Sequence, residues 1–124
     1  MRESVVEAVL DLAAIVPPGR VLSYGDVAEL LEVGGPRLVG RIMSLHGEAA
    51  PWWRIIRANG SLPDALMARA VVHYRREGTP LSEPAAAPAK VRMVQARWMP
   101  HDEEFAAIER LRRKVSEATD GMGA

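Results

Sequence analysis

The sequence predicts a small α+β domain that is mostly helical, with a helix-turn-helix at its centre and an extra C-terminal helix. Three observations support this fold class. The chain has 124 residues, the length of one domain, and 48% of them are hydrophobic, so that a core can form. Apolar residues recur at helical spacing in several segments. Two of these segments are short and are separated by a glycine-rich turn.

Residues 2–15 predict the first helix, because valines and leucines recur at near-helical spacing with acidic residues between them. The sequence VPPGR (16–20) ends this helix, since paired prolines and a glycine cannot continue it. The acidic residues also argue against a signal peptide. No apolar run approaches the roughly 18 residues that a membrane span needs, so we expect no contact with a membrane.

The first helix of the helix-turn-helix is predicted to begin at Ser23. Ser23 and Asp26 have the spacing of a capping box, with aspartate in place of the stronger glutamate. In such a box each side chain accepts a hydrogen bond from the backbone of the other residue. This spacing predicts a short helix from Tyr24 to about Leu31.

The second helix of the pair is predicted after the tight turn VGGP (33–36), because Pro36 suits the first turn of a helix. The sequence RLVGRIMSLH (37–46) then has apolar residues on one side and Arg37 and Arg41 on the other. Two short helices, the second basic and amphipathic, form the pattern of a DNA-binding helix-turn-helix. Many other helical hairpins share this pattern.

The middle of the chain predicts a hairpin followed by a helix. RIIRANGSL (54–62) reads as a short strand, a turn at Asn59 and Gly60, and a return strand. PDALMARAVVHYRREG (63–78) is typical of a helix that ends at Gly78.

The last third of the chain predicts a loop and a further helix. Residues 79–90, rich in proline and alanine, are expected to form a surface loop, and KVRMVQARW (90–98) a strand or a wing. Residues 102–118 are expected to form a helix, and residues 119–124 a frayed tail. The apolar stripe of this helix comprises Phe105, Ile108, Leu111 and Val115. We therefore divide the chain into a domain at 1–99 and a C-terminal helix with its tail at 100–124.

Composition restricts the chemistry that this chain can perform. It has no cysteine, which excludes disulfides, thiolate nucleophiles and cysteine-bound metals, and cytoplasm is the default compartment. His46, His73 and His101 lack metal-ligand spacing, so we expect no metal and no cofactor. The net charge is zero, with 16 basic and 16 acidic residues. Because the acids gather toward the two ends, one face of the protein could still be basic.

Three sequence motifs in this order resemble one family over roughly residues 2–98. They are VPPGRVLSYGDVAELL (16–31), PRLVGRIMSLH (36–46) and PWWRIIRANGSL (51–62). Together they resemble the DNA-binding domain of the O6-alkylguanine-DNA alkyltransferase family. The resemblance implies a winged helix-turn-helix-like DNA-binding domain.

The third motif differs from that of the repair enzymes at its most important position. In those enzymes the motif is Pro-Cys-His-Arg, in which the cysteine takes the alkyl group from damaged guanine and the histidine helps to deprotonate it. Pro51 and Arg54 match, but Trp52 stands where the cysteine belongs. This substitution marks the alkyltransferase-like proteins, which bind the lesion without repairing it. These proteins usually keep the histidine, whereas this chain has Trp53 there.

The resemblance implies that the protein finds O6-alkylguanine in duplex DNA, flips the nucleotide out and holds it. We expect no catalytic residue, because alkyl transfer needs a good nucleophile and indole is a very poor one near neutral pH. The protein would then present the lesion to nucleotide excision repair. The expected partners are double-stranded DNA containing O6-alkylguanine and excision-repair proteins, and the expected state is a monomer, associated with the nucleoid if the source is bacterial.

Four residues are expected to contact DNA. In the family, the arginine that matches Arg37 enters the base stack and fills the space left by the flipped nucleotide, and the tyrosine that matches Tyr24 pushes on the neighbouring phosphate. Arg41, one turn after Arg37, is interpreted as a phosphate contact or a solvated charge. Ser23 is included as a candidate, although a helix cap is its simpler role.

The double tryptophan is interpreted as a binding surface, since a flipped purine can stack on an aromatic ring for roughly 1–3 kcal/mol. On a strand, Trp52 and Trp53 would point to opposite faces. We expect Trp52 to line the lesion pocket and leave Trp53 open between pocket and core. Six residues form the expected pocket: Tyr24, Pro51, Trp52, Trp53, Arg54 and Ile55.

Two of these pocket residues are expected to act through their backbone or through a partner. The carbonyl of Ile55 matches one that receives the guanine amine in the family. Arg54 is interpreted as structural, tying the pocket loop to a carboxylate. No residue after Gly60 could be identified as the one that closes the pocket.

Three alternatives to damage recognition remain open at this point. The first is a winged-helix transcription regulator that reads a fixed operator as a dimer, with the apolar stripe at 105–115 as the dimer contact. The second is an enzyme with another nucleophile, and the third is a module that binds only proteins. The feature that argues against the first alternative is the Trp-Trp-Arg sequence at 52–54, which a transcription regulator does not require.

Overall fold

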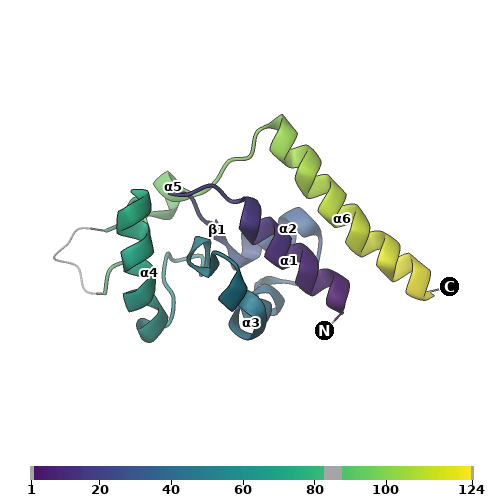
Figure 1. Ribbon diagram of the computed structural model, residues 1–124, viewed down its shortest axis with the longest axis horizontal. Coiled ribbons are helices and arrows are strands. Elements are labelled where there is room, and N and C mark those ends of the chain that lie inside the picture. Colours follow the sequence, from purple (N-terminus) through teal and green to yellow (C-terminus); the bar gives the residue numbers. More distant parts are fainter. Residues whose placement is uncertain (1, 83–87, 124) are drawn as a thin grey trace.

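The computed structural model describes residues 2–82 and 88–123 of the chain. Helices α4 and α6 lie at the two ends of the molecule, and the remaining elements lie between them (Figure 1). In chain order the elements are α1 (Glu3–Ile15), β1 (Leu22–Ser23), α2 (Tyr24–Leu31), α3 (Pro36–His46), the 3₁₀ turns η1 (Gly47–Ala49) and η2 (Trp52–Arg54), β2 (Ile55–Ile56), α4 (Asp64–Glu77), α5 (Met93–Ala96) and α6 (Asp102–Gly123). The predicted class, a mostly helical α+β fold with a C-terminal helix, is confirmed.

The helix-turn-helix consists of α2, a turn and α3, as predicted. The hydroxyl of Ser23 accepts a hydrogen bond from the amide of Asp26 at 3.0 Å, and the Asp26 carboxylate accepts one from the amide of Ser23 at 2.9 Å. The capping box therefore starts α2 at Tyr24. Glu32 ends the helix in the left-handed conformation, with φ of 54°. Pro36 occupies the first turn of α3.

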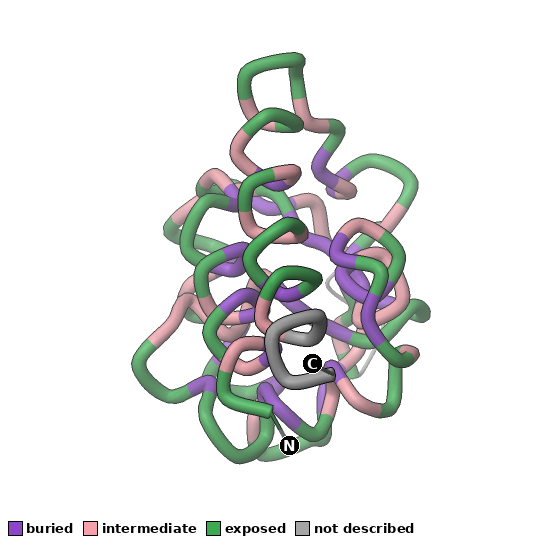
Figure 2. The backbone as a smooth tube through the Cα atoms, turned by 90° about the vertical axis from the view of Figure 1, so that its right-hand side faces the viewer, coloured by how far each residue is buried: buried purple, intermediate pink, exposed green. Residues whose placement is uncertain are grey.

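Two hydrophobic clusters share the short strand pair between them. Strands β1 and β2 are parallel, with Leu22 opposite Ile55. Leu22 and Ile55 pack into a cluster with α1, α2, α3 and α6, whereas Val21 and Ile56 pack into a second cluster beneath α4. Since neighbouring residues of a strand point to opposite faces, this segment joins the two halves of the core. Figure 2 shows the buried residues gathered in the interior, with exposed residues on the outer turns.

Helix α6 packs along α1, and the start of α1 lies at the same end of the molecule as the end of α6 (Figure 1). Ile108 and Val115 are buried in the first cluster, whereas Phe105 remains 48% exposed. The helix extends to Gly123, beyond its expected end at residue 118, and the frayed tail stays a prediction. The division at residue 99 stays a prediction.

The predicted hairpin at 54–62 is wrong. After β2 the chain forms a turn in which the amide of Arg57 donates to the carbonyl of Ser61 at 3.1 Å. The expected return strand does not form, because the carbonyl of Gly60 accepts instead from the amide of Val91 at 2.9 Å. Gly60 has φ of 83°, and a Cβ there would lie 2.1 Å from the carbonyl oxygen of Val91, so only glycine fits.

The segment expected to be a strand or a wing contains isolated bridges and a short helix. Leu81 bridges Val91 in antiparallel fashion, and Val21 bridges Arg97 in parallel fashion. Helix α5 lies between these bridges. The expected surface loop at 79–90 lies partly outside the described residues.

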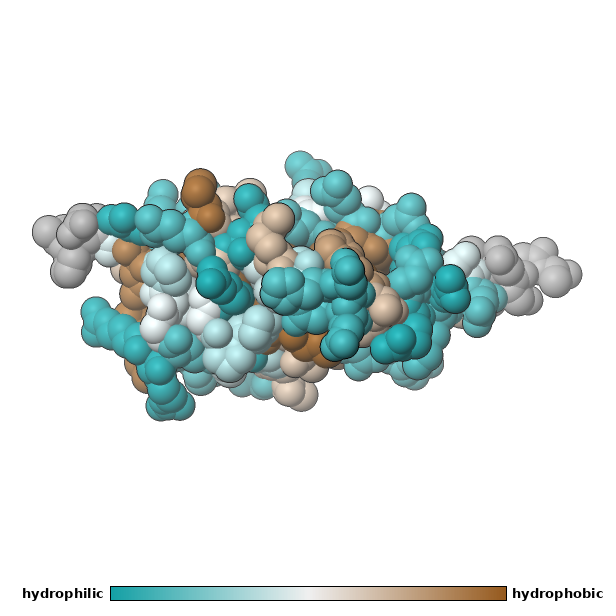
Figure 3. Space-filling model, turned by 90° about the horizontal axis from the view of Figure 1, so that it is seen from above, coloured by the Kyte–Doolittle hydropathy of each residue, from teal (hydrophilic) through white to brown (hydrophobic). Residues whose placement is uncertain are grey.

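The surface seen from above is largely hydrophilic, with small and separate hydrophobic areas (Figure 3). The large apolar side chains that are most exposed include Val94, Met99 and Leu45. Within the part of the chain that the structure describes, no helix combines the length and the apolar character that crossing a membrane requires.

Candidate nucleic-acid interface

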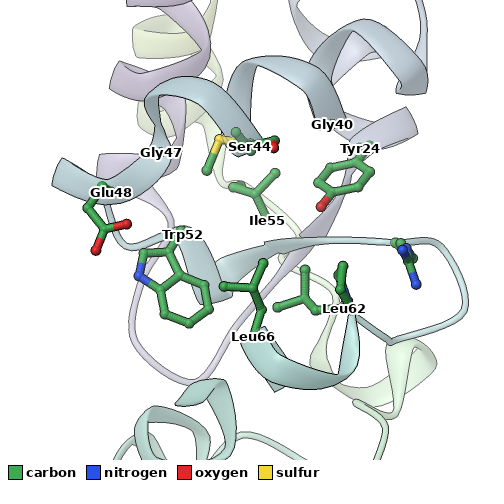
Figure 4. Close-up of a pocket in the computed structure, with 12 residues that line it drawn as sticks. Tyr24, Gly40, Ser44, Gly47, Glu48, Trp52, Ile55, Leu62 and Leu66 are labelled. Atoms are coloured by element: carbon green, nitrogen blue, oxygen red, sulfur yellow. The ribbon is translucent and has the colours of Figure 1, made fainter. Parts of the chain in front are cut away.

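A mainly apolar pocket of about 340 Å³ opens beside the helix-turn-helix (Figure 4). Helix α3 lies along one side of it, and the start of α4 lies along the other. The residues that line it are Tyr24, Gly40, Met43, Ser44, Gly47, Glu48, Trp52, Ile55, Arg57, Leu62, Pro63 and Leu66. Small-molecule pockets of about this size combine apolar walls with a few polar groups, as this one does.

Trp52 is half-buried and lines the pocket at the end where Glu48 lies (Figure 4). Two rings support it edge-on. The Trp53 ring has its centroid 5.6 Å away at an interplanar angle of 88°, and the His73 ring lies at 5.9 Å and 80°. The guanidinium carbon of Arg69 is 5.0 Å from the centroid of the Trp52 ring. These contacts fix the plane that Trp52 offers to the pocket.

Tyr24 lies at the opposite end of the pocket from Trp52 (Figure 4). Its ring packs directly on Gly40 of α3, where a Cβ would lie 3.2 Å from two ring carbons. Burial raises the pKa of Tyr24, although the charge of Arg57 acts in the lowering direction. The phenol is therefore a neutral hydrogen-bond donor near pH 7.

Trp53 does not line this pocket. Its ring stacks on His73, with centroids 3.6 Å apart and planes 8° apart, and its indole nitrogen donates to Glu77 at 3.0 Å. The hydroxyl of Tyr74 donates to the backbone carbonyl of Trp53 at 2.6 Å. Trp53 is thus fixed behind the pocket, against the last two turns of α4.

Arg54 also points away from the pocket, toward Glu77. Its Nη2 lies 2.5 Å from Oε1 of Glu77, and its Nε donates to Oε2 at 3.2 Å. Its Nη1 donates to the carbonyl of Val16 at 3.0 Å. The exposed fractions of the two side chains are only 14% for Arg54 and 10% for Glu77, so this ion pair is largely buried.

We call Trp53, Arg54, His73, Tyr74 and Glu77 the rear network, in which Glu77 accepts from Trp53 and Arg54 while His73 and Tyr74 contact Trp53. The amide of Gly19 also donates to the Glu77 carboxylate, at 3.1 Å. Burial by itself raises the pKa of Glu77, but the hydrogen bonds from Arg54, Gly19 and Trp53 outweigh it and hold the pKa below its ordinary value. The role of Glu77 was not found from the sequence. Its one signal is that it is an acid within a mainly basic stretch.

Three exposed arginines lie at or near the pocket without a side-chain partner among the described residues: Arg37, Arg41 and Arg57. On α3, Arg37 and Arg41 have helical spacing to Gly40 and Ser44, which line the pocket, so the four residues share one face. Arg57 lines the pocket from the turn after β2. Its position here was not anticipated from the sequence.

Of the remaining predicted site residues, one lines the pocket and two do not. Ile55 lines the pocket, whereas Pro51 is half-buried and does not. Ser23 is only 3% exposed and uses its hydroxyl as the cap of α2, which leaves it little surface for DNA. Apolar residues, Leu62, Pro63 and Leu66, close the side after Gly60.

Among the described residues, no group of three or more histidine and acidic side chains is placed to hold a metal ion. The lining of the pocket contains one carboxylate, Glu48, and one cation, Arg57. The site is therefore suited to binding through shape, stacking and a few charges.

Comparisons with known proteins agree with this geometry. The family model of the 6-O-methylguanine DNA methyltransferase DNA-binding domain matches residues 4–79. A crystal structure of S. pombe ATL in complex with DNA is similar, with 27% identity, a TM-score of 0.68, and coverage of 81% of this chain and 100% of that chain. A crystal structure of S. pombe Atl1 with damaged DNA containing O6-carboxymethylguanine has 29% identity and the same TM-score and coverage. A search of the curated proteins found no match. The chain belongs to the 6-O-methylguanine DNA methyltransferase DNA-binding domain family and is an alkyltransferase-like member of it.

Proposed function

We propose that this protein recognises O6-alkylguanine in duplex DNA by flipping the nucleotide into the pocket, and that it holds the base without removing the alkyl group. The observation that carries this proposal is a mainly apolar pocket, lined by Trp52, directly beside the helix-turn-helix. The similar S. pombe Atl1 structure contains damaged DNA with O6-carboxymethylguanine, which supports the same ligand class here.

The pocket suits a flat base that carries a small apolar group. Trp52 offers a fixed aromatic ring, and stacking of a base on such a ring is worth roughly 1–3 kcal/mol. Leu62 and Leu66 supply apolar surface on the facing side. An O6-alkyl group buried among these side chains would gain about 25 cal/mol per Å² of apolar area. Ordinary guanine lacks that group and gains less.

The surface around the pocket suits a duplex. Helix α3 is the second helix of the helix-turn-helix, and its exposed Arg37 and Arg41 share a face with the pocket. We propose that Arg37 fills the gap left in the base stack, while Arg41 contacts a phosphate. We propose that Tyr24, a neutral donor at the pocket, contacts the backbone of the flipped nucleotide.

The proposed absence of alkyl transfer rests on the side chains in the pocket. Alkyl transfer needs an activated nucleophile, such as a thiolate paired with a base. The chain has no cysteine, and neither of the tryptophans at 52 and 53 is such a nucleophile. Ser44 lines the pocket, but the described lining includes no histidine to activate its hydroxyl. We propose that the held lesion is passed to nucleotide excision repair by a monomeric protein.

The direct test is a titration of two matched duplexes, one with guanine and one with a single O6-methylguanine, at one stated salt concentration. The proposal predicts tighter binding of the damaged duplex, and weaker binding of both duplexes as salt rises. Equal affinities would contradict the proposal and favour the transcription regulator that the helix-turn-helix alone also permits.

Absence of transfer is tested separately by mass spectrometry of the intact protein after incubation with O6-methylguanine DNA. The expected mass is unchanged. A gain of one methyl group would contradict a binding-only function. Mapping of the modified residue would then identify the nucleophile.

A further inference from the structure

We propose that Arg57 is a further DNA-contacting residue, and that its guanidinium binds the backbone phosphate of the flipped nucleotide where that nucleotide enters the pocket. This inference rests on the proposed function, since it concerns the same pocket. It adds a contact from the turn between β2 and α4, a segment separate from the helix-turn-helix.

The backbone that carries Arg57 is held in place by its own turn. The amide of Arg57 donates to the carbonyl of Ser61 at 3.1 Å, and the amide of Gly60 donates to the carbonyl of Arg57 at 2.9 Å. The side chain of Asn59 accepts from the amide of Ser61 at 3.1 Å. Gly60 in turn pairs with Val91. The position of the Arg57 backbone is therefore set before DNA arrives, although its side chain is exposed.

The guanidinium of Arg57 is available for a ligand. Among the described residues it has no hydrogen-bond acceptor and no ion-pair partner. Other arginines of this chain are used differently: Arg54 is bound to Glu77, and Arg97 is bound to Asp26 at 3.0 Å. An unpaired guanidinium at the edge of an apolar pocket is a natural site for an anion, and its planar fork suits the oxygens of a phosphate.

The charges at the pocket are separated along its length. Glu48 lies at the Trp52 end, and Tyr24 lies at the opposite end (Figure 4). Arg57 is close enough to Tyr24 for its charge to act on that phenol. At the Trp52 end the carboxylate of Glu48 pairs with Arg69 at 3.5 Å, so the unpaired cation of the pocket lining, among the described residues, is Arg57. A nucleotide whose base lies against Trp52 would meet that unpaired cation by placing its phosphate at the Tyr24 end.

A phosphate fits Arg57 better than the other acceptors of a nucleotide do. Contact with the edge of the base would require the guanidinium inside the pocket, but Arg57 is exposed at its rim. For Arg57 to bind an acidic group on the O6 substituent instead, that group would have to lie at the same end of the pocket as the phosphate. The backbone phosphate is present in every nucleotide, so the contact does not depend on which alkyl group is attached.

The test compares Arg57→Gln and Arg57→Lys with the wild-type protein in binding to the O6-methylguanine duplex. Arg57→Gln should bind about tenfold more weakly, as expected for loss of one charge-assisted hydrogen bond, and the slope of log affinity against log salt should fall by about 0.9. Arg57→Lys should keep most of the affinity. The matched control is Arg75→Gln, because Arg75 is exposed and lies about 14 Å along α4 from Leu66.

The phosphate itself is tested with methylphosphonate, which is neutral, placed singly on each side of the lesion. At the contacted position the wild-type protein should lose about tenfold in affinity, and Arg57→Gln should lose nothing further. If the losses of affinity caused by Arg57→Gln and by methylphosphonate add in full at both positions, Arg57 binds neither phosphate. If Arg57→Gln binds as the wild-type protein and Arg75→Gln do, the inference is also overturned.

The outcome for Arg57 can be separated from the outcome for the proposed function. A wild-type protein that binds both duplexes equally would contradict lesion recognition. In that case Arg57 is judged by the methylphosphonate comparison alone. If the loss caused by methylphosphonate is the same in the wild-type protein and in Arg57→Gln at both positions, the role of Arg57 is contradicted as well. A wild-type protein that prefers the lesion while Arg57→Gln is unaffected would contradict Arg57 alone. Unfolding in urea should show the same midpoint for all variants, since the Arg57 side chain is exposed and unpaired among the described residues.

Discussion

Trp52 and Trp53 are neighbours in the sequence, yet they have different surroundings. Trp52 lines the pocket, with edge contacts to Trp53 and His73 and with Arg69 over its ring. Trp53 lies behind it, with one face stacked on His73 and its indole nitrogen bonded to Glu77. The bend that separates the two rings is the 3₁₀ turn η2. One ring is thus open to a ligand, while the other holds that ring in place.

The arginines show the same difference. Arg54 is largely buried and is paired with a carboxylate, as a buried charge must be. Arg37, Arg41 and Arg57 are exposed and have no partner among the described residues. A charge that already has a partner contributes to the fold, whereas an unpaired charge at the surface remains available to DNA. The comparison separates a supporting rear network from a binding surface.

The largest expected effect is on stability, and it tests the rear network. Glu77→Gln should lower the free energy of unfolding by about 3 kcal/mol, because it leaves the buried guanidinium of Arg54 without a counter-charge. Urea unfolding measures this loss. The matched control is Glu48→Gln, which should change stability by less than about 0.5 kcal/mol because the side chain of Glu48 is 86% exposed. Equal effects of the two substitutions on stability would contradict the distinction between the rear network and the binding surface.

The same network predicts how stability depends on pH. The pKa of Glu77 is held low in the folded protein, so its contribution to stability is present above the unfolded value of about 4.3 and is lost as pH falls through the folded value. The wild-type protein should therefore lose its advantage over Glu77→Gln as the pH is lowered below about 4. A gap in unfolding free energy that stays constant between pH 7 and 3 would show that the carboxylate's charge is not responsible.

The next effect is on DNA affinity, and it tests the binding surface. Arg37→Ala should weaken binding to lesion DNA by about 1–3 kcal/mol, since alanine cannot fill the gap in the base stack. It should also abolish the fluorescence rise of a 2-aminopurine placed as the flipped base. Arg41→Ala should weaken damaged and undamaged DNA about equally, as a phosphate contact does. If folded Arg37→Ala keeps its lesion affinity and its fluorescence signal, the role taken from the family is wrong.

The smallest expected effect concerns the C-terminal helix. Arg112 of α6 pairs with Glu109 and with Glu32, the left-handed residue that ends α2. These side chains are partly exposed, so Arg112→Ala should lower the midpoint of urea unfolding only slightly. Lesion affinity should not change, because none of the three lines the pocket. A clear loss of affinity would show that α6 influences the helix-turn-helix.

The sequence predicted those parts of the fold that depend on neighbouring residues. The capping box of Ser23 and Asp26, the position of Pro36 and the end of α4 at Gly78 all rest on contacts within a few residues. The hairpin at 54–62 was wrong because its second half pairs with Val91, some thirty positions later. Such a partner leaves no local pattern.

The candidate site was predictable to a similar extent. The motif order identified the family and drew attention to Trp52 and Tyr24, which line the pocket. It left Trp53 open, because the location of that ring depends on His73 and Glu77 of α4, which are twenty or more residues away. Arg57 was missed for a related reason, since its place at the pocket depends on how the turn after β2 docks.

The most direct measurement compares Trp52→Ala with Trp53→Ala, using lesion affinity and unfolding free energy for both. Trp52→Ala should lose about 1–3 kcal/mol of lesion affinity, and its loss of stability should be the smaller of the two variants' losses. Trp53→Ala should lose more stability, since it removes the stack on His73 and the hydrogen bond to Glu77, and the protein that remains folded should still prefer O6-methylguanine DNA. If Trp52→Ala keeps full lesion affinity, or if the two variants lose affinity and stability in the same proportion, the division between binding surface and rear network is contradicted.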